Sequence, residues 1–396
     1  MDTHLFLEML GIDSTSGKEG ELADMMAGRL SGPGRRVETF EVGDGTRNVL
    51  VSWGEPEVFF CTHLDTVPPY IPPYSVTVPS AKLTCFSAED RHCAEKATEN
   101  KEDGEIMFRG RGTCDAKGQI AAMYGACIEL ERRGRTGFAL LLLAGEETGS
   151  FGAKAFSQQH PGGDWVIVGE PTDNCMVSAS KGTKAFEVEF CGKPFHSGYP
   201  QHGVSAVMMF NDFVNALRDT DFPDDDILGD TTWNIGRLVS DNPQNILSDS
   251  LVCRIYFRTT FESDGMIAEI MDRIAEDVAA KYSLCTASDR DGGSRCHNTP
   301  EPAGGKHAGI AVKVKCLGGD VPSRCETFPG FKTKPVAFGS DAPHLNRFRH
   351  KALCGPGTIL VAHTADEYIM LGDIEEAARN YVKMFEHICG EAGQKR

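Results

Sequence analysis

The chain has 396 residues, of which 40% are hydrophobic and 24% are charged. This length and composition predict a globular protein of about two domains and exclude a mainly disordered or fibrous chain. Lysine and arginine number 40 against 57 aspartates and glutamates, and the resulting formal net charge of −17 argues against nucleic acid and anionic membranes as partners.

The N-terminal segment predicts a short amphipathic helix rather than a signal peptide, because Glu8 and Asp13 interrupt its apolar patch and no basic stretch precedes it. No apolar run in the chain approaches the ~18 residues that span a membrane. The 14 cysteines are scattered and include no CxxC pair, which favours free thiols over a disulfide framework. We therefore expect a cytoplasmic protein with no membrane partner.

The next part of the chain alternates short apolar runs with helical patterns. The segments in question are VFFCTHLD (58–65), IAAMYGACIELERRG (120–134), FALLLLAGEE (138–147) and WVIVGEP (165–171). This order predicts an α/β fold in which a parallel-rich sheet carries helices on both faces, and the uninterrupted apolar run 138–144 fits a strand covered on both sides. Ligands of such sheets bind at the carboxyl ends of the strands.

The pattern changes near Val177, where alternating strands and two long helical stretches predict a smaller α+β domain. The parallel-sheet pattern resumes at KPVAFGSDAP and ends with a helix over 373–390. We therefore expect one domain formed by residues 1–176 and 291–396, interrupted by a second domain over residues 177–290. The polar segments 87–104 and 288–305 predict surface loops.

Candidate chemistry begins at the end of the first apolar run. His63 and Asp65 are two positions apart and face the same side of a strand, so the carboxylate can fix the tautomer of a metal-binding imidazole. Asp115 follows the apolar residues 106–108 in a glycine-rich turn, where an aspartate can be either a ligand or an ordinary turn residue.

More carboxylates follow the later runs. Glu146 and Glu147 are adjacent at a buried strand end, Glu170 follows the next strand, and His363 precedes the last helix. Adjacent buried carboxylates need cations or shared protons, although acidic residues at a solvated helix N-terminus would give the same pattern. Two histidines and several carboxylates at expected strand ends suit a pair of divalent ions bridged by one carboxylate.

Six motifs in this order carry a resemblance that covers nearly the whole chain: HLDTVP, GRGTCDAKGQIAAM, GEETGSFGA, VGEPT, GKPFHSGYP and AHTADE. The chain resembles the dinuclear-zinc amidohydrolases that include acetylornithine deacetylase, succinyl-diaminopimelate desuccinylase, aminoacylase and carboxypeptidase G. The resemblance implies two zinc ions per subunit, with cobalt or manganese as alternatives. It assigns the site residues as follows: His63 and Glu170 bind one ion, Glu147 and His363 bind the other, Asp115 bridges them, Asp65 orients His63, and Glu146 is the general base.

The resemblance also gives roles to the interrupting domain, which serves as a lid and dimer contact in the family. It implies a homodimer in which His196 contacts the substrate carbonyl in the opposite subunit's active site, while Asn245 and Arg258 grip the substrate carboxylate. Without the resemblance, His196 would be an ordinary turn histidine and Arg258 a surface arginine. The segments 80–105 and 285–325 look longer than is usual in the family.

These observations predict a zinc-dependent hydrolase that cleaves the amide bond of a small N-acyl amino acid, most like acetylornithine deacetylase. The alternative within the family is a dipeptidase or carboxypeptidase. A non-catalytic binding relative is the alternative from another class, and it would have lost a ligand or the base, whereas all are present here.

Overall fold

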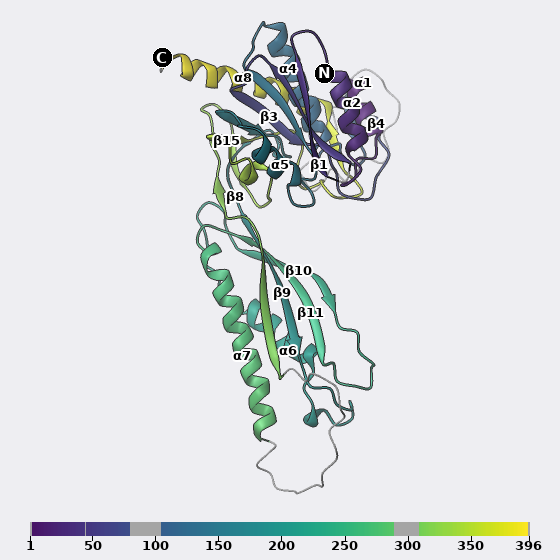
Figure 1. Cartoon of the computed structure of the whole chain (residues 1–396), viewed down its shortest axis with the longest axis vertical. Coiled ribbons are helices and arrows are strands. Elements are labelled where there is room, and N and C mark those ends of the chain that lie inside the picture. The colour runs from purple at the N-terminus through teal and green to yellow at the C-terminus, as the bar shows by residue number, and fades with distance from the viewer. Residues whose placement is uncertain (1, 44, 80–103, 289–308, 395–396) are drawn as a thin grey trace. The chain divides into compact units, whose positions relative to one another are not determined.

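The computed structural model describes residues 2–43, 45–79, 104–288 and 309–394 (Figure 1). Nearly all of the two polar segments expected as surface loops lies outside these ranges. The chain divides into two compact units, which we call the core unit and the inserted unit. The core unit comprises Met1–Ser178, Arg324–Val336 and Ser340–Arg396, and the inserted unit comprises Ala179–Ser323 and Ala337–Gly339.

A six-stranded sheet with the order β1-β2-β6-β3-β7-β15 forms the centre of the core unit. Its strands are β1 (Arg36–Gly43), β2 (Thr46–Trp53), β3 (Val58–His63), β6 (Phe138–Leu143), β7 (Trp165–Val168) and β15 (His350–Leu353). Strands β6, β3, β7 and β15 run parallel, while β1 and β2 are antiparallel to their neighbours. The expected α/β fold class, with a parallel-rich sheet, is confirmed.

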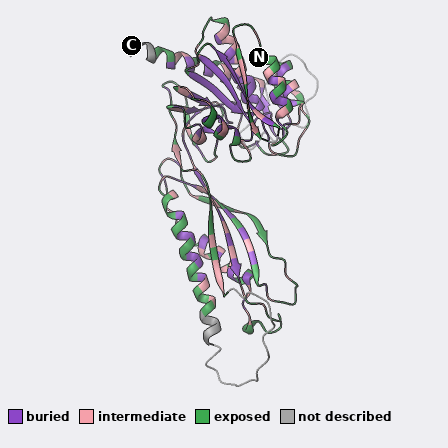
Figure 2. Cartoon of the chain, viewed as in Figure 1, coloured by how far each residue is buried: buried purple, intermediate pink, exposed green. Residues whose placement is uncertain are grey.

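Helices cover both faces of this sheet. Neighbouring strand residues point to opposite faces, so a strand of consecutive apolar residues needs cover on each side. Phe60 packs against Tyr381 of α8, whereas the adjacent Phe59 packs against Phe156 of α5. The helices are α1 (Thr3–Leu10), α2 (Gly20–Leu30), α4 (Lys117–Arg132), α5 (Phe151–Gln159) and α8 (Leu371–Gln394). Every residue of β3 and β6 is buried as a result, as Figure 2 shows for the strands of this unit.

Two smaller sheets accompany the central sheet, and the second includes Ala179, Ser180 and Ser323 of the inserted unit. One contains β4 (Tyr74–Pro79), β5 (Gly104–Arg109) and β16 (Tyr368–Met370), all antiparallel. The other contains β8 (Met176–Ser180), β13 (Ser323–Arg324) and β14 (Thr333–Val336). The apolar residues before Asp115 form β5, which pairs with β4 and β16 and not with the strands of the parallel sheet.

The inserted unit is an antiparallel sheet with the order β10-β11-β9-β12, packed against α6 (Ala206–Arg218) and α7 (Ile267–Ser288). Its strands are β9 (Gly182–Cys191), β10 (Thr232–Val239), β11 (Ser250–Thr259) and β12 (Ala311–Gly318). The unit begins close to the expected position but ends at Ser323 instead of residue 290. The physical reason is β12, which pairs along β9 and therefore belongs to this sheet.

Among the described helices, none combines the length and the hydropathy that crossing a bilayer would require.

Candidate functional site

His63 ends β3, at the carboxyl edge of the parallel strands, and its side chain is fully buried. Its Nδ1 lies 2.9 Å from the backbone oxygen of Asp65 and 3.5 Å from the Asp65 carboxylate. An N–H at Nδ1 therefore donates to the Asp65 carbonyl, and the lone pair of Nε2 is left to bind a metal ion. Burial lowers the pKa of His63, but Asp115 and Asp65 outweigh it and raise the pKa well above its usual value.

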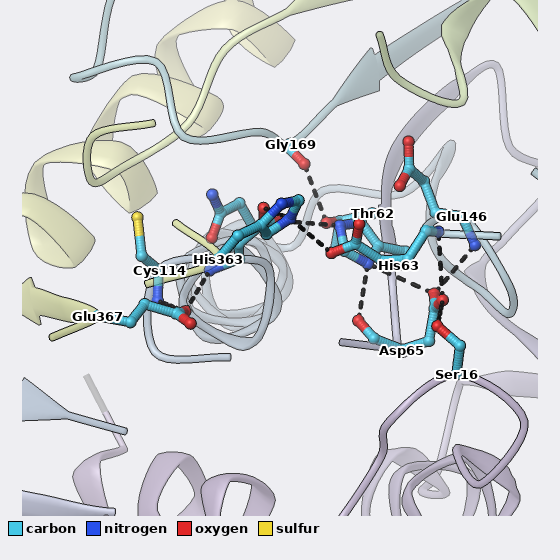
Figure 3. Close-up of polar contacts among 12 residues, drawn as sticks. Ser16, Thr62, His63, Asp65, Cys114, Glu146, Gly169, His363 and Glu367 are labelled. Atoms are coloured by element: carbon cyan, nitrogen blue, oxygen red, sulfur yellow. Dashed lines mark hydrogen bonds and ion pairs between the residues drawn. The ribbon is translucent and has the colours of Figure 1, made fainter. Parts of the chain in front are cut away.

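The Asp65 carboxylate has a second role that the sequence did not reveal. It accepts hydrogen bonds from the backbone N–H groups of Glu146 and Glu147 at 3.0 and 3.2 Å, and from the Ser16 hydroxyl at 2.8 Å (Figure 3). Burial raises the pKa of Asp65, but the contacts with His63, Ser16 and Glu146 lower it below its usual value. Asp65 thus fixes the segment that carries both adjacent glutamates.

Asp115 lies between the two histidines. One carboxylate oxygen is 3.0 Å from His63 Nε2, and the other is 3.3 Å from His363 Nε2, which is also 3.1 Å from Glu147 Oε1. These contacts lower the pKa of Asp115 despite its burial, and they raise the pKa of His363 to about 10. A carboxylate that presents one oxygen to each histidine has the arrangement that a bridging ligand needs.

The expected ligands fall into compact groups. In each group, one donor atom per residue lies within 4.8 Å of the others: His63, Asp115 and Glu170; His63, Glu146 and Glu147; and Asp115, Glu147 and His363. The first and third groups share Asp115 and match the two ion sites expected from the sequence. The structure therefore brings together all five residues predicted to bind metal.

These residues fit divalent cations. Glu170 is buried, and its Oε1 has no hydrogen-bond partner among the described residues, so a positive charge would satisfy it. Burial raises the pKa of both Glu146 and Glu170 well above the usual value and raises the pKa of Asp341 to about 6. Imidazole nitrogens with carboxylate oxygens form a donor set that suits zinc and also accepts manganese or cobalt.

Sequence reasoning missed two buried carboxylates, Asp341 and Glu367. Asp341 lies in the SDAPHL segment, and Glu367 is the last residue of the AHTADE motif. Glu367 accepts hydrogen bonds from the backbone N–H groups of Cys114 and Asp115 at 3.0 and 3.1 Å. Glu367 follows the candidate ligand His363 by four residues, and this acidic residue in the motif was the signal in the sequence that could have indicated it.

The remaining expected residues lie in the inserted unit. His196 and Asn245 are exposed and close together, because Ser197 N–H donates to the Asn245 carbonyl at 2.9 Å. Arg258, which lies over the Tyr256 ring, is at the far end of β11. Ser250 pairs with Cys191 and Arg258 with Thr183, so Asn245, which pairs with Ser197, lies beyond the Ser250 end of this pairing. At about 3.3 Å per residue, Ser250 and Arg258 alone are ~26 Å apart, which is too far for Asn245 and Arg258 of one copy to hold the same carboxylate. The roles of these three residues stay predictions.

Known proteins resemble this chain in sequence. Residues 59–387 match the model of peptidase family M20/M25/M40. A probable carboxypeptidase of Talaromyces marneffei is 31% identical over 96% of this chain and 84% of its own length. A probable carboxypeptidase of Emericella nidulans is 30% identical over 96% of this chain and 88% of its own length.

Solved structures share the fold at low identity. A tripeptidase of Staphylococcus aureus has a TM-score of 0.69 at 18% identity and covers 96% of this chain and 95% of its own. An aminopeptidase of Bacillus cereus has a TM-score of 0.67 at 18% identity, with 96% of both chains covered. A Bacillus subtilis protein described as a dinuclear metal binding peptidase has a TM-score of 0.61 at 12% identity, with 96% and 95% covered.

These comparisons change one expectation. The two relatives are named probable carboxypeptidases, so they favour the peptidase alternative over acetylornithine deacetylase as the nearest likeness. The family match covers both histidines and all the carboxylates of the candidate metal groups. The chain belongs to peptidase family M20/M25/M40, and it is a metal-dependent amidohydrolase or metallopeptidase of that family.

Proposed function

We propose that this protein is a carboxypeptidase that releases the C-terminal amino acid of short peptides at a dinuclear metal centre. The bridging arrangement of Asp115 between His63 and His363 carries the dinuclear centre of this proposal. The curated relatives named as probable carboxypeptidases support the substrate class. Two zinc ions fit the donors best, one with His63, Asp115 and Glu170 and one with Asp115, Glu147 and His363.

The residues around the metal groups supply the proton chemistry. Bound divalent ions polarise a carbonyl and lower the pKa of water. Glu146 belongs to a group with His63 and Glu147, and its carboxylate is placed to act as a general base that takes a proton from the attacking water and passes it to the leaving amine. Asp65 holds the backbone of Glu146 in place through the 3.0 Å hydrogen bond.

We also propose that the active form is a homodimer. His196 and Asn245 lie at one end of the inserted unit and Arg258 at the other. Because one substrate molecule cannot reach both ends within one copy, joint action by all three residues requires two copies. This supports the prediction that His196 serves the neighbouring subunit. A cytoplasmic location remains a proposal from the cysteine pattern.

A substrate panel tests the proposed function. Metal-loaded protein is given short peptides with a free or an amidated C-terminus, dipeptides, N-acetylornithine and other N-acyl amino acids. We expect the peptides with a free C-terminal carboxylate to give the highest kcat/KM and the amidated peptides to be poor substrates. Activity should disappear after chelation and return with zinc or cobalt.

The control is Glu146→Gln protein purified in the same way, which reports any contaminating peptidase. Equal cleavage of amidated and free peptides would contradict the carboxypeptidase assignment. Preference for N-acetylornithine would restore the deacetylase alternative. Full activity in metal-free protein would contradict the metal mechanism itself.

A further inference from the structure

A buried ion pair lies beside the candidate metal groups without belonging to them. Arg111 Nη1 donates to Glu367 Oε2 at 2.7 Å, and the two side chains are 3% and 0% exposed. Burying two charges costs free energy that their attraction offsets only when the remaining polar atoms are also hydrogen-bonded. A buried ion pair is not by itself evidence of a stabilising role. The other hydrogen bonds of Arg111 and Glu367 indicate the role of this pair.

The second oxygen of Glu367 holds the backbone of the bridging ligand. Oε1 accepts from Cys114 N–H at 3.0 Å and from Asp115 N–H at 3.1 Å, as Figure 3 shows for Cys114. The Glu367 carbonyl also accepts from Gly110 N–H at 3.1 Å. Glu367 therefore holds the segment 110–115 at both ends, through Gly110 at one and through Cys114 and Asp115 at the other. Asp115 is the last residue of this segment.

Arg111 extends these contacts to the segment that follows His63 and Asp65. Its Nε donates to the Pro69 carbonyl at 3.3 Å, and its backbone N–H donates to the Ile71 carbonyl at 3.1 Å. Glu367 itself follows His363 by four residues. The pair thus joins three segments, which carry His63, Asp115 and His363.

Asp65 and Glu367 make matching contacts on the two sides of the site. Asp65 accepts from the backbone N–H groups of Glu146 and Glu147, and Glu367 accepts from those of Cys114 and Asp115. In both cases a fully buried carboxylate holds two consecutive amides, the second of which belongs to a candidate ligand. Contacts of this kind fix a ligand in the orientation that a metal ion needs.

We propose that Glu367, held by Arg111, is a positioning residue that sets the bridging carboxylate of Asp115 and so raises metal affinity. The inference rests on the proposed dinuclear centre. It assigns Glu367 no contact with substrate or metal. Its effect passes through the backbone of Asp115 and through the short connection to His363.

The test titrates metal-free protein with Co²⁺. Calorimetry measures the affinity of each bound ion, and visible absorption reports its coordination. Glu367→Gln keeps the size of the side chain, but its NH₂ group must face either Arg111 or the two backbone N–H groups. We expect the affinity for at least one of two bound ions to fall about 10- to 100-fold and the absorption spectrum to change. Glu376→Gln makes the same change at an exposed position on helix α8, nine residues after Glu367, so it is the matched control and should bind as the wild type does.

Arg111→Lys is measured in parallel, because breaking a buried pair can unfold a protein. It keeps a positive charge beside Glu367 but replaces the planar guanidinium, whose Nε and Nη1 make separate contacts, by a single ammonium that cannot keep the geometry of both, and we expect a smaller loss of metal affinity in the same direction. Circular dichroism shows which variants fold. If a folded variant binds both ions with affinities within twofold of the wild-type values and with an unchanged absorption spectrum, the positioning role is wrong. If the wild type binds no ion, the proposed function fails instead.

Discussion

The two adjacent glutamates differ in their contacts, and this difference separates a base from a ligand. Glu147 belongs to two of the candidate metal groups and lies 3.1 Å from His363, whereas Glu146 belongs to one. Glu146→Gln keeps the shape but cannot take a proton, so we expect kcat to fall ~100-fold or more with near-normal metal content. Glu147→Gln should lose metal as well.

Both variants are measured by steady-state kinetics and by elemental analysis of the bound metal. Their positions are neighbours on one segment held by Asp65, so each serves as the control for general disturbance of that segment. Equal metal loss in the two proteins, or normal turnover in Glu146→Gln, would reverse the assignment.

At the residue scale, the sequence could reveal those site residues that directly follow apolar runs. His63 ends β3, and Glu146, Glu147 and Glu170 lie two to four positions beyond buried strands. The contacts of Glu367 could not be predicted, because they join positions more than 250 residues apart whose meeting depends on the completed fold. The amide contacts of Asp65 were hidden for the same reason.

At the scale of elements, the connection from β6 to α5 carries both glutamates and is closed by Asn48. The buried Asn48 amide donates to the Gly152 carbonyl at 2.8 Å, and its oxygen accepts from Ala144 N–H at 3.0 Å. A Cβ on Gly152 would lie 2.4 Å from the Ala144 oxygen and 2.5 Å from Asn48 Oδ1. No room exists there for any other residue without a shift of the backbone.

Gly152→Ala should therefore lower the free energy of unfolding by about 1–3 kcal/mol and reduce kcat, since the glutamate segment must move. Urea unfolding of the metal-free protein measures the first effect. Gly28→Ala on α2 is the control: it is exposed, no atom lies within 4 Å of the added Cβ, and we expect about 0.5–1 kcal/mol of stabilisation. A Gly152→Ala protein as stable and active as the wild type would show that the connection tolerates the shift.

Local pattern predicted the type of most elements but not the partners of two strands. β11 alternates buried Leu251, Cys253, Ile255 and Phe257 with more exposed residues, as expected for a sheet with one covered face. The apolar run of β5 looks like another parallel strand, yet its pairing with β4 and β16 places it in a separate sheet. β12 alternates valine and lysine, which indicates a strand but not the unit to which it belongs.

At the scale of the whole molecule, the dimer proposal can be tested by mixing two inactive proteins. His196→Ala supplies an intact metal centre without the histidine, and Glu146→Gln supplies the histidine without the base. After subunit exchange, one site of each mixed dimer has both, so activity should return to roughly a quarter of the wild-type value at equal mixing. Native mass spectrometry measures the extent of exchange.

A mixture of Glu146→Gln with Glu147→Gln is the matched control, because every site then lacks one core residue and should stay inactive. If mixed dimers form and the first mixture remains inactive, His196 does not serve the neighbouring subunit. It would then act within its own chain or be an ordinary turn histidine.

The interruption of the core unit sets an order of events during translation. His63, Asp115 and Glu170 leave the ribosome before the inserted unit begins at Ala179, whereas His363 follows only after that unit ends at Ser323. At ~5–20 residues per second, this delay is about 10–40 s, during which β7 lacks its neighbour β15. A nascent or prematurely terminated chain thus contains His63, Asp115 and Glu170 but neither His363 nor Glu367, so the group of Asp115, Glu147 and His363 and the contact that holds the Asp115 backbone are completed last.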